Sequence, residues 1–354
     1  MKSKVILVVL CAIFCLAFLF SPRINSETYA DTSAQAMVVI EANSNRVLMS
    51  KNENIKRANA STTKIATFLT VLKHCKNFDE IVEIDDRAIG IEGTSIYLRK
   101  GEKLTVKELL YGMMLVSGND AATALALHIS DSVDDFARLM TKEAHACGAL
   151  NSTFKNPHGL DQDGHQTTAY DLAQITRECY KYPIFEEIVT TQNVKIPNGD
   201  NGYRYLKNKN KLLWSLDGCV GVKTGFTNDA GRCLVSSARR NNMHLICVVL
   251  SCGPMFEDSA YMIEQCFSNY SMSNILPPYN YIKSIPVSNS EKTSVKVYTQ
   301  RGFMYPLTKE EEQNIKIEID AQDVLVAPVE KEQIVGEIKI FTCYFPKKSI
   351  LWKM

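Results

Sequence analysis

Gly221–Thr227 has the sequence GVKTGFT and stands among runs of residues that favour β-structure. Gly218–Lys223 leads into it, and Arg232–Ala238 and His244–Leu250 follow a turn that contains glycine. The last run is almost continuously apolar, which is typical of a strand covered on both faces. The sequence therefore predicts a sheet buried between two layers, with Lys223-Thr224-Gly225 where one of its strands ends.

Further elements are predicted before and after this sheet. Ala36–Ile40 and Arg46–Met49 read as two strands around a turn. Thr105 and Glu108 form a capping box that starts a pair of helices over residues 105–129. Three more helices are expected at Ser132–Cys147, Ala169–Tyr180 and Phe256–Phe267. Strands on either side of a helical middle indicate an α/β (α+β) sandwich with a helical insertion.

A small all-β domain is predicted beyond residue 280. Pro277-Pro278 and nearby serine and asparagine residues mark a linker at 273–280. Thr308–Gln313 is expected to be a solvated turn because it is rich in charged side chains. The strands expected here are Tyr281–Val287, Ser294–Thr299, Ile315–Ile319, Val324–Ala327 and Ile334–Phe341. The predicted division is a larger domain at 31–272, the linker, a β-rich domain at 281–345 and a basic tail at 346–354.

The N-terminus has the layout of a secretory signal. Lys2 and Lys4 precede an unbroken apolar run of 16 residues, Val5 to Phe20, and Thr28-Tyr29-Ala30 offers a small residue for cleavage. We expect residues 1–30 to be a signal peptide or, since this run is marginal for a membrane span, an uncleaved anchor. The protein is therefore expected to be exported, to the outer face of the cytoplasmic membrane, the cell wall or the periplasm.

Composition and cysteine spacing give no support for a nucleic-acid-binding protein or for a disulfide-rich or zinc-binding one. The 40 basic and 39 acidic residues give a formal net charge of +1, which gives no support for binding nucleic acid through bulk positive charge. Of 11 cysteines, Cys11 and Cys15 lie in the signal, and the others form no C-x-x-C pair. Their scatter is typical of small buried residues and not of a disulfide framework or a zinc site.

A nucleophilic serine needs a base within hydrogen-bond reach. Helical spacing begins at Ser61, and in Ser61-Thr62-Thr63-Lys64 the lysine lies one turn from the serine. A helix start also offers free N–H groups and the positive end of the dipole to a developing oxyanion. The pattern alone is weak, because S-x-x-K recurs at Ser152–Lys155 and usually means a helix cap beside a surface lysine.

Two further motifs add weight to Ser61. Ser117-Gly118-Asn119 places a hydroxyl and an amide on a tight turn between helices, where both can point into one cleft. Lys223-Thr224-Gly225 adds a cation, a hydroxyl and a glycine that lets a substrate backbone approach the strand. Read singly, each motif is a turn or a strand end.

In the order S-x-x-K, S-x-N, K-T-G, the three motifs resemble those of penicillin-binding proteins and serine β-lactamases. The resemblance runs from about Ala36 to Phe267, and more loosely through the β-rich tail. It implies a serine β-lactamase/D,D-peptidase-like sandwich and a serine-type carboxypeptidase that trims peptidoglycan stem peptides. The stretches that resemble D-alanyl-D-alanine carboxypeptidases of low molecular mass are Asn156–Asp161, Gly164-His165, Thr167–Asp171, Gly221–Thr227, Ala230-Gly231 and Cys233-Leu234.

The resemblance also implies a role for each motif residue. Ser61 is expected to attack the carbonyl of the penultimate D-alanine, with neutral Lys64 as the general base. Burial near Lys223 would lower the pKa of Lys64 in the direction that this role needs. Ser117 is expected to relay a proton to the leaving amine, and Asn119 to hold a substrate amide.

The terminal carboxylate of the substrate is expected to bind Lys223 and Thr224, with Gly225 admitting the peptide backbone. The backbone N–H groups of Ser61 and Phe226 would form the oxyanion hole. Water would then resolve the acyl-enzyme. The resemblance implies no metal and no other cofactor, and it implies β-lactam antibiotics as covalent inhibitors.

The sequence departs from the family pattern at two places. Asn59 stands where members usually have proline, and Cys252–Ala260 lacks an arginine that many carry to help hold the carboxylate. Two other functions stay open at this point. One is a β-lactamase, which hydrolyses its acyl-enzyme quickly, and the other is a non-catalytic wall-binding protein of the same fold.

Two remaining segments have competing interpretations. His158 and His165, with Asp161 and Asp163 nearby, have no recognised metal-ligand spacing, so a structural role in fixing this loop is expected. Pro346–Met354 is short for the amphipathic membrane helix that often ends the family. It could contact a membrane surface weakly, and the alternative is a frayed basic tail.

Overall fold

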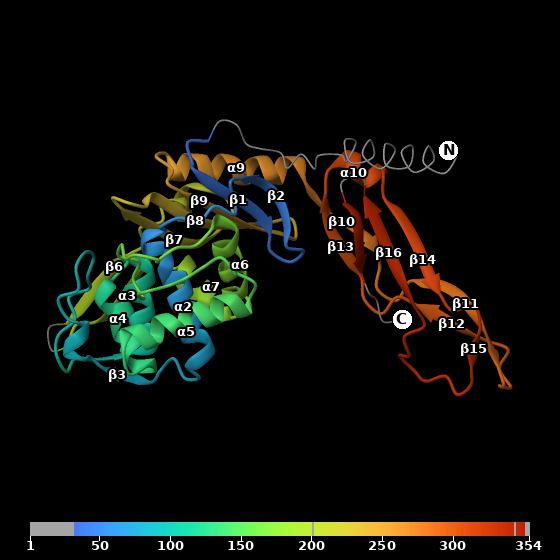
Figure 1. Cartoon of the computed structure of the whole chain (residues 1–354), viewed down its shortest axis with the longest axis horizontal. Helices are drawn as coiled ribbons and strands as arrows, with labels where there is room; N and C mark the ends of the chain where they lie inside the picture. The colour runs from blue at the N-terminus through green and yellow to red at the C-terminus, as the bar shows by residue number, and fades with distance from the viewer. Residues whose placement is uncertain (1–31, 200–201, 343–344, 351–354) are drawn as a thin grey trace, which may run out of the picture.

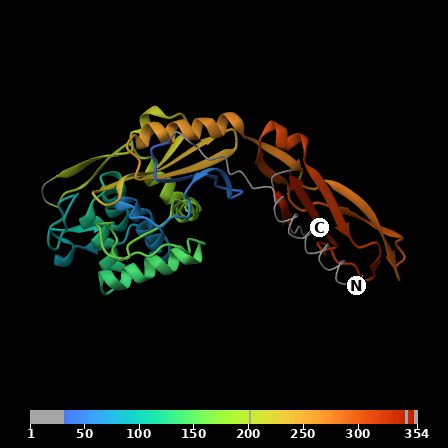
Figure 2. The ribbon, with the colours of Figure 1, turned by 45° about the horizontal axis from the view of Figure 1, so that its top comes forward.

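The computed structural model describes residues 32–199, 202–342 and 345–350, and the predicted signal at 1–30 lies outside these ranges. The chain forms a larger α/β domain and an all-β arm that continues from the end of a long helix, α9 (Figure 1). Figure 2 shows the same separation from a second side. No helix among the described residues is long and apolar enough to cross a membrane.

A five-stranded antiparallel sheet forms the centre of the larger domain. Its strand order is β2-β1-β9-β8-β7, so β7 lies at one edge. The strands are β1 (Ala36–Glu41), β2 (Arg46–Lys51), β7 (Cys219–Thr227), β8 (Gly231–Arg240) and β9 (Met243–Leu250). K-T-G was expected at a strand end, and this prediction was wrong, because β7 continues through it to Thr227.

Both faces of the sheet are covered, as the continuous apolar run of β9 predicts. Every residue of β9 is buried. Val38 and Ile40 of β1 pack into a core with the helical layer, whereas Met37 and Val39 pack on the other face with α9 (Met255–Asn269). In Figure 1, α9 lies on one side of the sheet and the remaining long helices lie on the other.

The helical layer starts with a short 3-10 turn, η1 (Ala60–Thr63), before α2 (Lys64–His74). The predicted capping box is confirmed, because Thr105 Oγ1 accepts from the N–H of Glu108 and the Glu108 carboxylate accepts from the N–H of Thr105. The other helices are η2 (Asp86–Ala88), α3 (Val106–Leu115), α4 (Asn119–Ile129), α5 (Val133–Ala146), α6 (Ala169–Cys179), α7 (Pro183–Thr190) and α8 (Leu212–Ser215). Two small hairpins pair β3 (Ile81–Glu83) with β4 (Lys103–Thr105) and β5 (Asn193–Pro197) with β6 (Tyr203–Lys207).

The C-terminal part is all-β apart from one short helix, α10 (Lys309–Gln313), in its described residues. Its sheets pair β10 with β13, β11 with β12 and β15, and β16 with β14 and β17. The strands are β10 (Ser271–Leu276), β11 (Tyr281–Ser288), β12 (Ser294–Tyr298), β13 (Phe303–Leu307), β14 (Lys316–Ala321), β15 (Leu325–Val326), β16 (Gly336–Thr342) and β17 (Phe345–Ile350).

Three details of this part differ from the prediction. The segment expected to be a linker at 273–280 contains most of β10, which pairs with the unpredicted strand β13. The expected tail at 346–354 begins inside β17, which pairs with β16. Thr308–Gln313 is not a solvated turn, because Thr308 and Glu311 form a capping box and Glu311 is 2% exposed.

Candidate functional site

Ser61 and Lys64 meet at the junction of η1 and α2. The predicted helix start at Ser61 is a 3-10 turn, and Lys64 is the first residue of α2. One turn of helix still separates them, and Lys64 Nζ lies 2.9 Å from Ser61 Oγ. The sequence spacing therefore brings a hydroxyl nucleophile within reach of an amine base.

Lys64 is fully buried and contacts three oxygen acceptors. Besides Ser61, its Nζ donates to Asn119 Oδ1 and to the His158 carbonyl oxygen, both at 2.7 Å. Burial, followed by the charges of Lys223 and Lys209, holds the pKa of Lys64 well below its ordinary value of 10.5, and Asp120 opposes this weakly. A neutral amine keeps a lone pair, so the Ser61 hydroxyl can donate its proton to Nζ.

Ser117 and Asn119 lie on the turn between α3 and α4, as the sequence predicts. Ser117 has a φ of 72°, and its buried Oγ has no hydrogen-bond partner among the described residues. Asn119 is the first residue of α4, and its Nδ2 donates to the Glu92 carbonyl oxygen at 2.5 Å while its Oδ1 accepts from Lys64. The turn thus joins Lys64 to the loop around Glu92 and leaves one buried hydroxyl for another partner.

Lys223 contributes a second buried amine from β7. It is 1% exposed, and its Nζ donates to the Thr224 carbonyl oxygen at 3.0 Å. Burial and the charge of Lys209 lower its pKa from 10.5 to about 7. No carboxylate of the described residues forms an ion pair with it. A buried amine without a counter-ion is suited, in its charged form, to bind an anionic group of a ligand.

The structure explains the glycine at position 225 by packing within the protein, whereas the sequence suggested access for a substrate backbone. A Cβ at this position would lie 3.0 Å from the Thr62 nitrogen and 3.1 Å from the Ser61 nitrogen. The missing side chain therefore lets β7 pack directly against η1. Phe226, the next residue, is 63% exposed, and Thr224 is partly exposed on the same strand.

Lys209 is a site residue that the sequence did not indicate. It is an exposed residue after β6, its N–H donates to the Leu115 carbonyl oxygen, and its Nζ lies 3.5 Å from Thr94 Oγ1. Its charge acts on both Lys64 and Lys223. Three lysines from separate segments thus share one region, and no local spacing in the sequence connects them.

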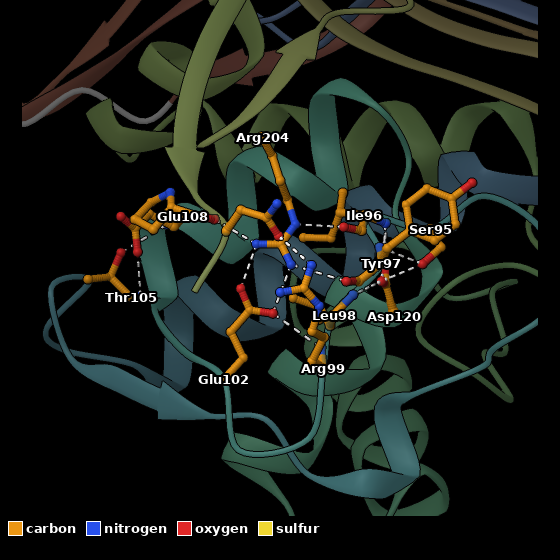
Figure 3. Close-up of polar contacts among 12 residues, drawn as sticks. Ser95, Ile96, Tyr97, Leu98, Arg99, Glu102, Thr105, Glu108, Asp120 and Arg204 are labelled. Atoms are coloured by element: carbon orange, nitrogen blue, oxygen red, sulfur yellow. Dashed lines mark hydrogen bonds and ion pairs between the residues drawn. The ribbon is translucent and has the colours of Figure 1, made fainter. Parts of the chain in front are cut away.

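Asp120 fixes the loop beside this site. Its carboxylate accepts from the N–H groups of Ile96 and Leu98 and from Ser95 Oγ, at 2.5 to 3.1 Å. On the other side, Arg204 of β6 points to Glu102 and donates to both of its carboxylate oxygens at 2.6 and 2.8 Å (Figure 3). The loop is therefore held from α4, next to Asn119, and from the β5–β6 hairpin.

The histidines have structural contacts, in line with the expected loop-fixing role. His165 Nδ1 accepts from the Lys155 N–H at 3.1 Å, so its Nε2 is free to donate to Thr63 Oγ1 at 2.8 Å. Burial, followed by Lys155, lowers the His165 pKa to about 4, and burial with Lys64 lowers that of His158 to about 3. No group of three possible metal ligands is close enough to hold an ion within the described ranges.

The second S-x-x-K copy is not a catalytic pair. Ser152 Oγ is buried and contacts Asp171 Oδ2 at 2.8 Å and Thr167 Oγ1 at 2.7 Å. Lys155, in contrast, is exposed. The two S-x-x-K copies have the same spacing, and only their tertiary surroundings distinguish the copy at Ser61 from the copy at Ser152.

Comparison with family models assigns both parts of the chain. Residues 23–253 match the D-alanyl-D-alanine carboxypeptidase family, and residues 270–343 match the C-terminal domain of penicillin-binding protein 5. Among similar proteins, D-alanyl-D-alanine carboxypeptidase DacF of Bacillus subtilis is 33% identical over 86% of this chain and 80% of its own length. D-alanyl-D-alanine carboxypeptidase DacA of Escherichia coli is 31% identical over 90% and 79%.

Solved structures share the whole architecture. Penicillin-binding protein 5 of Haemophilus influenzae matches with a TM-score of 0.76 and 28% identity, covering 91% of this chain and 95% of that one. D-alanyl-D-alanine carboxypeptidase DacD of Francisella tularensis matches with a TM-score of 0.71 and 26% identity, covering 91% and 92%. The predicted D,D-peptidase-like fold with a C-terminal all-β domain is confirmed. The chain belongs to the family of serine D-alanyl-D-alanine carboxypeptidases.

Proposed function

We propose that this chain removes the terminal D-alanine from peptidoglycan stem peptides through an acyl-enzyme at Ser61. The observation that carries the proposal is the Lys64 amine, fully buried and 2.9 Å from Ser61 Oγ. Its depressed pKa supports the neutral form that a general base needs. The family to which the chain belongs has this activity in its description.

Acylation uses the residues that surround Ser61. Its Oγ forms a bond to the penultimate D-alanine carbonyl carbon while Lys64 takes the hydroxyl proton. Ser117, whose Oγ is buried and unpartnered in the described structure, passes its hydroxyl proton to the nitrogen of the leaving D-alanine as the C–N bond breaks. It takes in exchange the proton that Lys64 accepted from Ser61, which leaves Lys64 neutral again. The N–H groups of Ser61 and Phe226 stabilise the oxyanion, and one such donor typically contributes about 3–4 kcal/mol.

Lys223 and Thr224 bind the terminal carboxylate of the substrate in this proposal. A carboxylate beside Lys223 favours its charged form, so binding raises a pKa that is about 7 in the free protein. Asn119 continues to accept a hydrogen bond from Lys64 through its Oδ1, and it orients an amide of the substrate. Because the cation has no internal counter-ion, peptides with a free C-terminus are preferred over amides.

Hydrolysis completes the cycle when water attacks the acyl-enzyme and Lys64 again accepts a proton. A β-lactam presents a strained amide and a carboxylate to the same groups, so it acylates Ser61 and is released slowly. We place the chain outside the cytoplasmic membrane, exported by residues 1–30, with α/β residues 31–272 catalytic and the β-rich part holding them in position. We also propose that the C-terminal arm makes peripheral contact with the membrane.

The test uses purified protein, a fluorescent penicillin and diacetyl-Lys-D-Ala-D-Ala. The native protein should form a long-lived covalent adduct and release D-alanine, and Ser61→Ala should do neither. Ser215→Ala, which changes an exposed serine, is the matched control and should behave as native. A short-lived adduct with rapid drug turnover would identify a β-lactamase. Absence of both adduct and release would identify a non-catalytic wall-binding protein.

A further inference from the structure

One face of the β5–β6 hairpin is exposed to solvent. Side chains alternate along a strand, and in β6 the buried residues are Arg204 and Leu206. The alternate residues Tyr203, Tyr205 and Lys207 lie on the other face, which we call the hairpin face, and are exposed. Tyr203 is 61% exposed and Tyr205 is 74% exposed. Because the opposite face is packed, both rings are presented to solvent from a fixed element.

The hairpin face combines aromatic rings with cations. Lys195 pairs with Tyr205 across the hairpin, and its Nζ lies 5.2 Å from the centre of the Tyr205 ring. Lys207 Nζ lies 5.5 Å from the ring of Trp214 in α8, which is itself 46% exposed. Single exposed apolar residues are normal on a protein surface, whereas a contiguous group of them marks a binding surface.

The charge of the hairpin face is positive. The strand register places on it Asn193, Lys195, Pro197, Tyr203, Tyr205 and Lys207. None of these residues is acidic, and in the described part of the chain both lysines contact rings and neither forms an ion pair. The carboxylates of α7 pair elsewhere, Glu186 with Arg239 and Glu187 with Lys107. The complementary partner of this face is therefore anionic.

The aromatic rings narrow the choice of anionic partner. The apolar C–H faces of a pyranose ring stack on tyrosine and tryptophan, and carboxylates on the same polymer pair with lysine. Anionic lipid headgroups suit the same side chains. In Figures 1 and 2, however, the hairpin lies on the side of the larger domain away from the C-terminal arm, which we place at the membrane. A sugar polymer therefore fits this position better than lipid does.

The hairpin is fixed next to the catalytic cleft. Lys209, two residues after β6, donates its N–H to the Leu115 carbonyl oxygen, close in sequence to Ser117. Arg204 donates to the Ile96 carbonyl oxygen at 2.7 Å, on the loop that Asp120 holds from the other side. A polymer that lies on the hairpin face is thus kept close to the cleft.

We propose that the hairpin face binds the glycan strand of peptidoglycan, outside the cleft that receives the stem peptide. The inference rests on the proposed carboxypeptidase function and names a second contact with the same substrate. The rings stack on sugars, and Lys195 and Lys207 pair with carboxylates of the stem peptides along the strand. Because one strand carries many stems, one section can lie on the hairpin face while another supplies a stem to Ser61. Two linked contacts raise the effective concentration of substrate at the cleft.

The test measures D-alanine release by the purified protein from the free stem pentapeptide and from uncross-linked glycan strands that carry the same pentapeptide. The native kcat/KM per stem should be about 10-fold higher on the strands, and this ratio should fall as salt is added. Tyr203→Ala/Tyr205→Ala should bring the ratio to about one, with kcat/KM on the free pentapeptide unchanged. Lys195→Gln/Lys207→Gln should lower the ratio and remove most of its salt dependence.

Tyr279→Ala/Tyr281→Ala is the matched control, because it removes two exposed rings from the C-terminal part, and it should keep the native ratio. A native ratio of one or less, or an unchanged ratio in Tyr203→Ala/Tyr205→Ala, would overturn the inference and leave the carboxypeptidase function intact. With the ratio unchanged, binding to phosphatidylglycerol vesicles that is lost in Tyr203→Ala/Tyr205→Ala would assign the hairpin face to a membrane instead. Failure of the native protein to release D-alanine from either substrate would reject the proposed function, and the inference with it.

Discussion

The guanidinium of Arg46 in β2 forms a buried, two-pronged ion pair with the carboxylate of Glu311 in α10. One prong joins Nη1 to Oε2 at 2.9 Å, and the two side chains are 6% and 2% exposed. Arg46 also donates to the Pro306 carbonyl oxygen and lies over the rings of Tyr270 and Tyr305, 5.1 and 5.4 Å from their centroids. The C-terminal arm is thereby attached to an edge strand of the catalytic sheet.

Glu311→Ala should destabilise the protein by about 3–5 kcal/mol, because it removes the carboxylate that pairs with the buried Arg46 and also removes a capping box. Denaturant unfolding measures this loss. Glu312→Ala, one residue further in the same helix and exposed, is the control and should change stability by less than about 0.5 kcal/mol. Equal losses for the two variants would show that the ion pair does not hold the parts together.

The pH dependence of kcat/KM should have a falling limb near pH 7. Lys223 loses its proton as the pH rises through its pKa of about 7, and the substrate carboxylate then loses its cation. The rising limb belongs to Lys64 becoming neutral, since burial, followed by the charges of Lys223 and Lys209, holds its pKa well below 10.5. Lys223→Arg keeps the charge at all these pH values, so its falling limb should disappear. A falling limb that stays in place would assign it to another group.

Lys223 should also lower the stability of the folded state at neutral and acidic pH. Its pKa is about 7 in the fold and 10.5 ordinarily, so the unfolded chain binds the proton more tightly. Folded stability therefore rises between about pH 7 and 10.5 and is lowest below pH 7. Lys223→Met should stabilise the fold at pH 6 by up to about 4 kcal/mol more than at pH 10.

Unfolding of native and Lys223→Met protein at the two pH values checks this expectation. Lys331→Met, at an exposed position of the C-terminal part, is the control and should show no such difference. An equal effect of Lys223→Met at pH 6 and pH 10 would contradict a buried, titrating amine.

Gly159→Ala should cost both activity and stability because it separates the loop from the nucleophile turn. The new Cβ would lie 1.9 Å from the Ala60 carbonyl oxygen, and φ at this position is +88°. Gly148→Ala is a matched control with a φ of +93° and no atom within 4 Å of its Cβ. The control should lose only the strain of a left-handed residue, about 1–2 kcal/mol, with normal acylation.

Acylation by fluorescent penicillin and denaturant unfolding measure the two effects for both variants. We expect Gly159→Ala to acylate at least about 100-fold more slowly than native, as a misplacement of about 1 Å can produce. Similar acylation rates in the two variants would mean that the contact between Gly159 and Ala60 does not position Ser61.

Local sequence patterns pointed to those candidate site residues that lie together on one element of the fold. Ser61 with Lys64, and Ser117 with Asn119, each lie within a helix turn or an interhelical turn, so spacing alone places them. Lys209 was missed because only the fold brings it to Lys64 and Lys223. For the same reason, the spacing could not separate Ser61 from Ser152, which differ in tertiary surroundings and not in motif.

The fold shows the same division between local and tertiary information. The alternation and apolar runs of β1, β8 and β9 predicted the sheet because both faces are buried. Glu311 was expected in solvent because three glutamates in a row normally are, yet one of them pairs with Arg46, 265 residues away in the sequence. β13 escaped prediction because it is short and includes Pro306, which weakens a strand pattern.

The free thiols of the chain have a consequence for where it can fold. Seven cysteines of the described residues are free thiols, and five of them are buried, namely Cys75, Cys179, Cys233, Cys247 and Cys252. Burial raises the pKa of Cys233 and Cys252 to about 11 and that of Cys247 to about 12, so the reactive thiolate is scarce. These seven cysteines therefore contribute packing and no covalent cross-link to the larger domain, so reducing surroundings should leave it folded.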